Sequence, residues 1–197
     1  MATARRIEGY AIVSDDGMLA NANRHMPDQL KVEGDQIFFE RALDGVDVVV
    51  HGRHSQEQQA RAPQRLRLIL STHVAGIAPD PHNAKARLWN PAGATFEQAL
   101  DALGARDPVV AVIGGPQAFG LFLDRYDVFY LSRAPGVRLP GGRPVFPEVP
   151  ALTPEQVLAE HGYEAIERRV IDEAKNVEVV GWRRRGGPGQ IGRPTAA

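Results

Sequence analysis

The sequence predicts a single α/β domain in which helices flank a central mixed, mostly parallel sheet that ends in a C-terminal β-hairpin. Apolar runs of strand length, such as residues 109–113, alternate with stretches whose apolar residues recur at helical spacing. Two late strand-like runs, residues 163–171 and 177–184, are joined by a short polar segment, which predicts the hairpin. We therefore expect one domain over residues 1–185 and a Gly- and Pro-rich, disordered tail over 186–197.

The other elements follow from the same patterns, taken in chain order. Strands are expected over residues 7–14, 45–50, 66–70, 86–90, 109–113 and 127–132, with a brief extended piece at 145–147. Helices are expected over residues 32–43, 96–103 and 116–123. Thr95 is a suitable N-cap for the second helix, and Gly104 is a suitable stop. Residues 21–31 and 74–85 are expected to be loops.

Composition excludes several classes of protein. The 197 residues carry a formal net charge of -1, which gives no reason to expect a nucleic-acid or membrane partner. Because the chain has no cysteine, it can form neither a disulfide nor a thiolate metal site. We see no signal peptide and no membrane span, so we expect a cytoplasmic protein. His51 and His54 lack an evident third ligand, and no metal site is expected.

The strand over residues 109–113 leads into Gly114-Gly115 and then Pro116, which suits the first position of a helix. Phe119 and Leu123 follow at helical spacing. Glycines let a ligand approach the backbone, and a helix N-terminus attracts anions. This pattern is compatible with a phosphate site or with a tight turn that binds nothing.

Asp35 lies at the start of the expected helix over residues 32–43, on the same face as Phe38 and Phe39. One interpretation is a carboxylate at the edge of an apolar pocket, available to bind a ligand or assist a proton transfer. The other is an acidic residue that caps the helix or complements its dipole.

Polar residues also follow two other strands. Gly52, Arg53, His54 and Ser55 come after the strand over residues 45–50, and Ser71 and Thr72 come after the strand over 66–70. Taken separately, each group is compatible with a solvated loop. If the strands are parallel, these groups and the diglycine share one edge of the sheet, which indicates a nucleotide site.

In this order the pieces resemble the dihydrofolate reductase family over residues 7–184. The resemblance rests on ordered short motifs. They are Met26-Pro27, Asp35 with Phe39, Gly52-Arg53-His54-Ser55, Pro63-Gln64-Arg65, Ser71-Thr72, Ile113-Gly114-Gly115 with Phe119, Tyr130-Leu131-Ser132 and Val145-Phe146-Pro147. The resemblance implies NADPH-dependent reduction of dihydrofolate, with hydride passing to C6 of the pterin and a proton to N5.

The resemblance also implies roles for individual residues. Asp35 would be the catalytic acid, and Ser132 would support its hydrogen bonds. Tyr10 and Phe39 would contact the substrate, and Arg65 would bind its glutamate carboxylate. The cofactor would lie against Ala11, Ile12, Ala20, Gly52, Arg53, His54, Ser55, Ser71, Thr72, Gly114, Gly115, Gln117, Ala118 and Phe119. The family also joins the two glycines by a cis peptide, which we predict here.

The sequence departs from the family at several positions, and these leave the substrate open. Asp28 stands where the family has tryptophan, and Gln36 and Gln58 or Gln59 stand where aliphatic residues line the pterin pocket. Residues 14–20 are also similar to the reductase domain of riboflavin biosynthesis, which shares the fold and NADPH but reduces a ribosylated pyrimidine. A nucleotide-binding module without catalysis is the third alternative.

Overall fold

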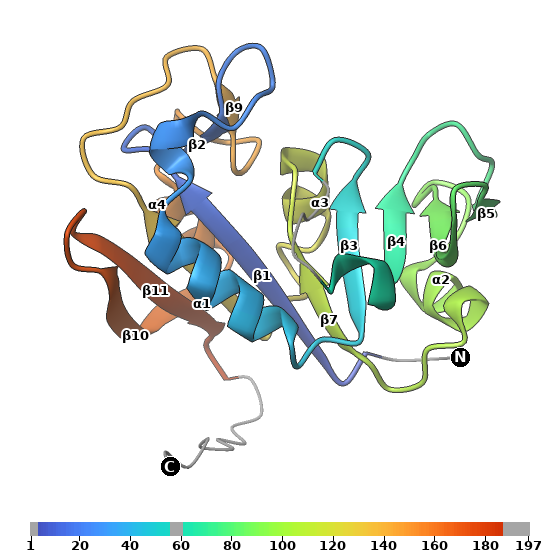
Figure 1. Ribbon diagram of the computed structural model, residues 1–197. Helices are drawn as coiled ribbons and strands as arrows, with labels where there is room; N and C mark the ends of the chain where they lie inside the picture. Colours follow the sequence, from blue (N-terminus) through green and yellow to red (C-terminus); the bar gives the residue numbers. More distant parts are fainter. Residues whose placement is uncertain (1–3, 56–60, 187–197) are drawn as a thin grey trace.

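The computed structural model describes residues 4–55 and 61–186 and arranges them around one large twisted sheet (Figure 1). In chain order the strands are β1 (Arg6–Val13), β2 (Met18–Ala20), β3 (Val48–Gly52), β4 (Leu66–Leu70), β5 (Ile77–Asp80), β6 (Asn83–Trp89), β7 (Val109–Val112), β8 (Val128–Arg133), β9 (Arg143–Pro144), β10 (Tyr163–Asp172) and β11 (Val177–Arg184). The helices are η1 (Asp28–Leu30), α1 (Glu33–Leu43), η2 (Ala62–Gln64), α2 (Phe96–Leu103), α3 (Pro116–Leu121) and α4 (Pro154–Glu160).

The large sheet has the strand order β10-β11-β8-β1-β7-β3-β4-β6-β5 in the part of the chain that the structure describes. The strands from β8 to β6 are parallel to one another, whereas β5, β11 and β10 are antiparallel to their neighbours. The expected mixed, mostly parallel sheet with a C-terminal hairpin is confirmed. The segments that follow β3, β4 and β7 therefore meet at one edge, as the sequence analysis required.

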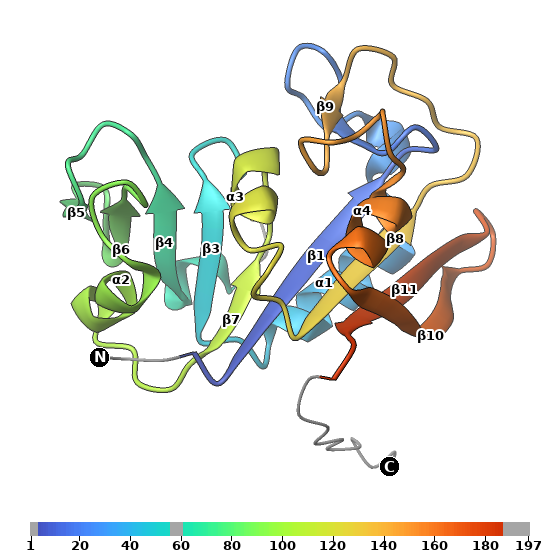
Figure 2. The ribbon, with the colours of Figure 1, turned by 180° about the vertical axis from the view of Figure 1, so that it is seen from behind.

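Helices cover both faces of this sheet. α1 packs on one face against a cluster that includes Tyr10 and Ala111 (Figure 1). α2, α3 and α4 cover the other face, where Leu100, Phe119 and Leu158 enter the main core (Figure 2). Because side chains alternate along a strand, each central strand contributes to both clusters. Central strands buried on both faces explain why they are continuous apolar runs in the sequence.

Two helices begin at capping boxes. Thr95 accepts a hydrogen bond from the Gln98 backbone N–H at 3.2 Å, and the Gln98 side chain accepts one from the Thr95 N–H at 2.8 Å. Thr153 and Gln156 form the same arrangement at the start of α4. The Thr95 cap predicts α2, whereas α4 is absent from the helices expected from the sequence. Its signal was present, because a Thr-Pro-Glu-Gln sequence combines a capping box with proline at the first helical position.

Two further expectations need correction. The prediction of a loop over residues 74–85 is wrong, because β5 and the first residues of β6 lie there. β5 is the last strand at its edge of the sheet, and Pro79 is tolerated at such an edge. The extended piece expected at residues 145–147 is displaced, since β9 ends at Pro144 and pairs with β2 in a separate small sheet. Both errors concern short strands whose proline content resembles a loop.

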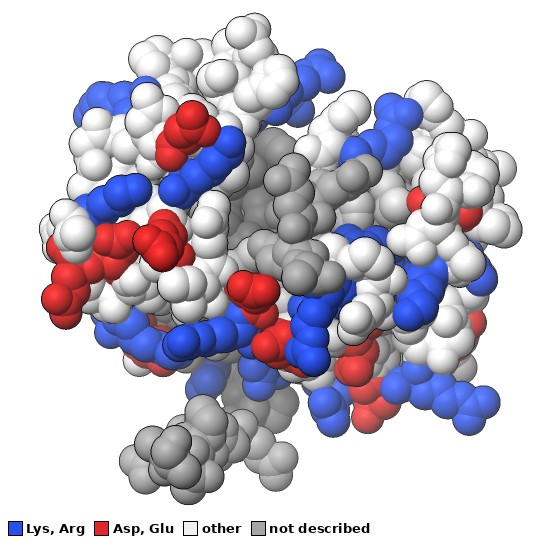
Figure 3. Space-filling model, viewed as in Figure 1, with Lys and Arg blue, Asp and Glu red and all other residues white. Residues whose placement is uncertain are grey.

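The face that carries α1 has positive and negative side chains interspersed (Figure 3). Arg61 and Asp44, for example, form an ion pair at 2.7 Å beside the C-terminal end of α1. No helix among residues 4–55 and 61–186 combines the length and apolar character that crossing a membrane requires.

Candidate active site

The diglycine turn and the loop after β3 are joined directly. The Gly52 N–H donates to the Gly114 carbonyl oxygen at 2.8 Å, and the Ile113 N–H donates to the Val50 carbonyl oxygen at 3.0 Å. The Gly114–Gly115 peptide bond is cis, as predicted. A Cβ atom built on Gly115 would lie 3.3 Å from the Ser55 Oγ. The two glycines thus form a narrow backbone surface that faces the end of β3.

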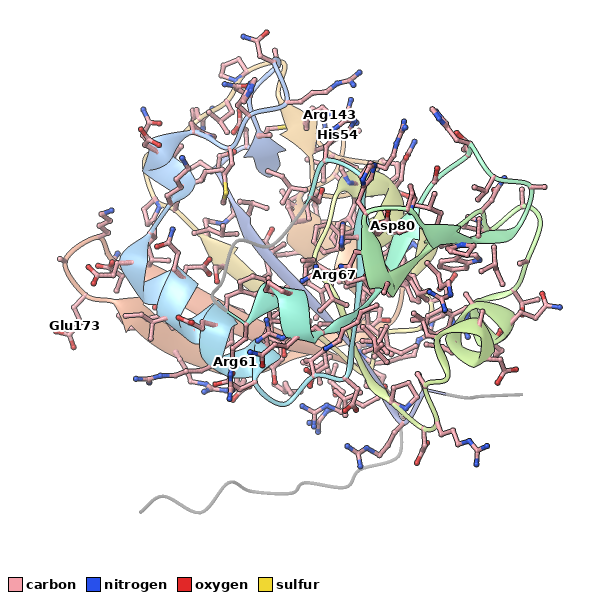
Figure 4. All side chains as sticks on the ribbon, turned by 45° about the vertical axis from the view of Figure 1, so that its right-hand side comes forward. His54, Arg61, Arg67, Asp80, Arg143 and Glu173 are labelled. Atoms are coloured by element: carbon pink, nitrogen blue, oxygen red, sulfur yellow. The ribbon has the colours of Figure 1, made fainter. Side chains whose placement is uncertain are left out.

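Cationic and polar side chains gather beside this surface, at the ends of β3 and β4. The Arg53 Nη1 lies 3.5 Å from the His73 Nδ1, and both side chains are exposed. The backbone N–H of His73 donates a hydrogen bond to the Ser71 Oγ at 3.2 Å, and this bond orders the turn after β4. Thr72 is also exposed there, and His54 lies in the loop beyond β3 (Figure 4). The sequence analysis did not select His73, although it directly follows the selected Ser71-Thr72 pair.

Asp35 lies in the first turn of α1, yet it does not cap the helix. The N-cap position is Val32, where no side chain makes a capping hydrogen bond. The Asp35 carboxylate instead accepts a hydrogen bond from Ser132 of β8. Desolvation raises the pKa of Asp35 from 3.8 to about 6, although the Ser132 hydrogen bond acts in the opposite direction. The geometry favours the interpretation of a carboxyl group at a pocket edge over that of a cap.

An aromatic cluster lies next to this carboxyl group, beneath α1. The ring centroids of Tyr10 and Phe39 are 5.9 Å apart, and Tyr10 stacks on Tyr130 at 5.2 Å. The Tyr10 hydroxyl donates to the buried carboxylate of Glu8, and burial raises the pKa of Tyr10. Tyr10 therefore presents its ring to the site, while its hydroxyl is hydrogen-bonded to Glu8, two residues earlier in β1. Glu8 is not among the residues predicted from the sequence, because a strand pattern does not show that this charged side chain is buried.

Arg65 is buried at the other end of α1. Its Nε donates to the Leu43 carbonyl oxygen at 3.2 Å, and its Nη2 lies 3.8 Å from the Asp44 carboxylate. Figure 4 shows Arg61 beside this end of α1, and Arg67 between Arg61 and His54. Arg65 thus lies against the C-terminal end of α1, whereas Asp35 lies in the first turn of this helix. Gln58 and Gln59 lie outside the described residues.

The other predicted cofactor residues differ in exposure. Gln117 is exposed and Ala11 and Ala20 are half-buried, whereas Ile12 is 6% exposed. Ala118 and Phe119 are 0% and 1% exposed, because their side chains pack in the main core. Any contact of Ala118 and Phe119 with a cofactor would therefore involve their backbone.

The residues present suit a dinucleotide phosphate. Gly52, Gly114 and Gly115 bring backbone close together at the ends of β3 and β7, and a Cβ atom on Gly115 would narrow the space between the two segments, since it would lie 3.3 Å from the Ser55 Oγ. Arg53 and His73 stand beside these glycines and can bind a phosphate monoester by charge and N–H donation. Residues 4–55 and 61–186 hold no group of three or more His, Asp or Glu side chains suited to a metal ion.

Comparison with solved structures shows that the chain has the dihydrofolate reductase-like fold. A protein from Shewanella sp. PV-4 described as belonging to riboflavin biosynthesis aligns with a TM-score of 0.64 and 20% identity, over 91% of this chain and 99% of that one. Dihydrofolate reductase from Enterococcus faecalis, complexed with NADP(H) and RAB-propyl, aligns with a TM-score of 0.63 and 17% identity, over 94% and 99%. No family model and no curated sequence matches the chain.

Proposed function

We propose that this protein is an NADPH-dependent reductase of a heterocyclic substrate, with 7,8-dihydrofolate as the preferred candidate. The observation that carries the proposal is Asp35, a desolvated carboxyl group with a pKa of about 6 beside an aromatic cluster. Perturbed acids of this kind cluster at catalytic sites. The second requirement is a place for the cofactor, for which the glycine turn and the neighbouring Arg53 and His73 side chains are suited.

The chain's own residues account for the steps other than hydride donation. NADPH, when bound, supplies the hydride that reaches the pterin carbon C6. Asp35 would hydrogen-bond the pterin ring and promote protonation of the neighbouring nitrogen, so that the carbon–nitrogen double bond becomes a single bond with one new hydrogen on each atom. Its pKa near 6 keeps part of the carboxyl protonated near neutral pH, which a general acid requires. Ser132 would orient the carboxyl, and the Phe39 ring would pack on the substrate.

The environment of Arg65 favours a substrate that carries a carboxylate. Its guanidinium is buried and oriented by the Leu43 carbonyl oxygen, so it is suited to a bidentate contact. We expect Arg65→Ala to raise the KM for dihydrofolate about tenfold or more, with a smaller change in kcat. Arg41→Ala, an exposed position in the last turn of α1, is the matched control. An unchanged KM in Arg65→Ala would argue against a glutamate-bearing substrate.

A second candidate is a reductase that acts on a ribosylated pyrimidine. The polar side chains of Asp28 and Gln36 favour it, because they are exposed near the start of α1 at positions where the resemblance to dihydrofolate reductase leads us to expect tryptophan and an aliphatic residue. The structural likeness to the Shewanella protein also supports this candidate at the level of the fold.

The deciding experiment is NADPH oxidation by the purified protein, followed by absorbance with and without each substrate. Oxidation that depends on dihydrofolate and is blocked by methotrexate supports the first candidate. Oxidation that depends on the ribosylated pyrimidine alone supports the second. If the protein binds NADPH but oxidises it with neither substrate, the result supports a non-catalytic binding module. If the protein does not bind NADPH, the result contradicts both reductase candidates.

A further inference from the structure

Gly34, the residue before Asp35, lies directly against the backbone of β10. A Cβ atom built on Gly34 would lie 1.8 Å from the Ile171 carbonyl oxygen and 2.9 Å from the Asp172 Cβ. Carbon and oxygen atoms that are not bonded do not approach so closely, and a carbonyl oxygen in a strand cannot rotate away like a flexible side chain. Only a hydrogen atom fits at this position of the helix.

The contact fixes the end of α1 that carries Asp35. Val32, the N-cap residue, is 1% exposed and belongs to the same buried cluster as Ile12, against which Ile171 also packs. Ile12 lies opposite Ser132 in the pairing of β1 with β8. The first turn of α1 is thus held between the end of β10 and the strands that carry the partner of Asp35.

The requirement for glycine is confined to this end of the helix. Gly45 follows the other end of α1, and there an added Cβ would meet only the Ala42 carbonyl oxygen, at 3.9 Å. The chain therefore contains a matched pair of glycines at the two ends of one helix, of which one is sterically required and the other is not.

We propose that Gly34 is a positioning residue for Asp35. Its close contact with the end of β10 holds the first turn of α1 in place, so that the Asp35 carboxyl can accept the hydrogen bond from Ser132. A side chain at position 34 would force the first turn of α1 away from the sheet and carry Asp35 toward solvent. The hairpin of β10 and β11 thereby takes part in the site without touching the substrate. The kinetic part of this inference rests on the proposed function.

The test compares Gly34→Ala with Gly45→Ala. We expect Gly34→Ala to lower kcat at least tenfold and to leave the Kd for NADPH within twofold of the natural protein. Because desolvation is the larger influence on Asp35, its pKa falls from about 6 toward the ordinary value, and the loss of activity on the alkaline side of the pH profile moves to lower pH. Gly45→Ala should change none of these. A Gly34→Ala protein that folds and keeps kcat, profile and Asp35 titration overturns the inference.

Carbon-13 NMR titration of the Asp35 carboxyl separates this inference from the proposed function. The titration needs no substrate, so it reports on the Gly34 contact even if the protein reduces neither candidate. Failure of the natural protein to oxidise NADPH would count against the proposed function alone.

A second pair of variants covers the case in which Gly34→Ala does not fold. Ile171→Gly loosens the strand behind Gly34, and Val170→Gly makes the same change at the neighbouring residue, which is 53% exposed. We expect Ile171→Gly to lower the pKa of Asp35 and to reduce kcat about threefold or more, while Val170→Gly does neither. Identical Asp35 titrations in Ile171→Gly and the natural protein would overturn the inference.

Discussion

The two halves of the candidate site are built on opposite electrostatic principles. Under α1, the Asp35 carboxyl is desolvated and its pKa is raised to about 6. At the ends of β3 and β4, Arg53 and His73 are exposed to solvent. Desolvation changes the proton affinity of a group at a cost in stability, whereas exposed cations attract an anion without that cost. From this difference we propose proton chemistry for the first half and phosphate binding for the second.

The surrounding residues reinforce this difference. Tyr10, Phe39 and Tyr130 form an aromatic cluster under α1, the helix that carries Asp35, and apolar rings exclude water. At the other half, Gly52 and Gly115 are half-buried and have no side chain, so a ligand could approach their backbone closely. Changes in the first half should therefore alter kcat and its pH profile, and changes in the second should alter cofactor affinity.

The largest expected effect comes from Asp35→Asn, which keeps the shape of the side chain and removes the titrating proton. We expect kcat to fall about a hundredfold to ten-thousandfold, the usual contribution of a general acid. The Kd for NADPH, measured by fluorescence, should stay within about twofold. Glu33→Gln, an exposed acid in the same helical turn, is the control. Equal kcat in Asp35→Asn and the natural protein would remove Asp35 from the mechanism.

The same variant should be more stable than the natural protein above pH 6. The pKa of Asp35 is raised in the folded state, so its contribution to stability is fully present below pH 3.8 and is lost as pH rises through about 6. A shift of this size corresponds to about 3 kcal/mol of unfolding free energy. Urea unfolding of both proteins at pH 4 and pH 8 measures it. A stability difference that does not grow with pH would show that Asp35 is solvated.

A smaller effect is expected from Arg53→Ala in the other half. The Kd for NADPH should rise about tenfold, because a phosphate loses one charged partner, and the Kd for NADH should not change, because NADH lacks that phosphate. Salt should weaken the preference in the natural protein, since these side chains are exposed. Titrations with both cofactors at low and high salt measure the effect, and Arg41→Ala is the control. An equal loss of affinity for NADH and NADPH would show that the phosphate-binding site does not include Arg53.

The smallest effect is expected from Ser132→Ala. Loss of one hydrogen bond should lower kcat less than tenfold. The hydrogen bond lowers the pKa of Asp35, so its removal should raise that pKa further and move the pH profile upward. The carbon-13 titration of Asp35 tests this direction. A lower pKa of Asp35 in this variant would mean that water replaces Ser132. The carboxyl would then be less desolvated than we infer, and the two halves of the site would differ less in their exposure to water.

Several parts of this site could be predicted because local sequence determines them. The buried strands, the capped helix after Thr95 and the turn at Gly114-Gly115 follow from apolar runs, a capping residue and glycine. His73 could not be selected in this way, because its partner Arg53 follows a different strand. Glu8 could not be selected either, because only the fold makes this charged side chain a buried one. The short strand β5 was missed because it is an edge strand that contains proline.

The sequence alone determined the order of elements, the parallel centre of the sheet and the edge at which glycines and cations meet, because these depend on periodicity and chain connectivity. Only the tertiary structure decided the state of Asp35. A residue in the first turn of a helix is compatible with a cap or with a proton donor, and the sequence left both open. Ser132 lies 97 positions further along the chain, and β10, which supports α1 at Gly34, is more distant still. The pKa of a carboxyl group depends on its water and its neighbours, and folding alone brings such distant groups together.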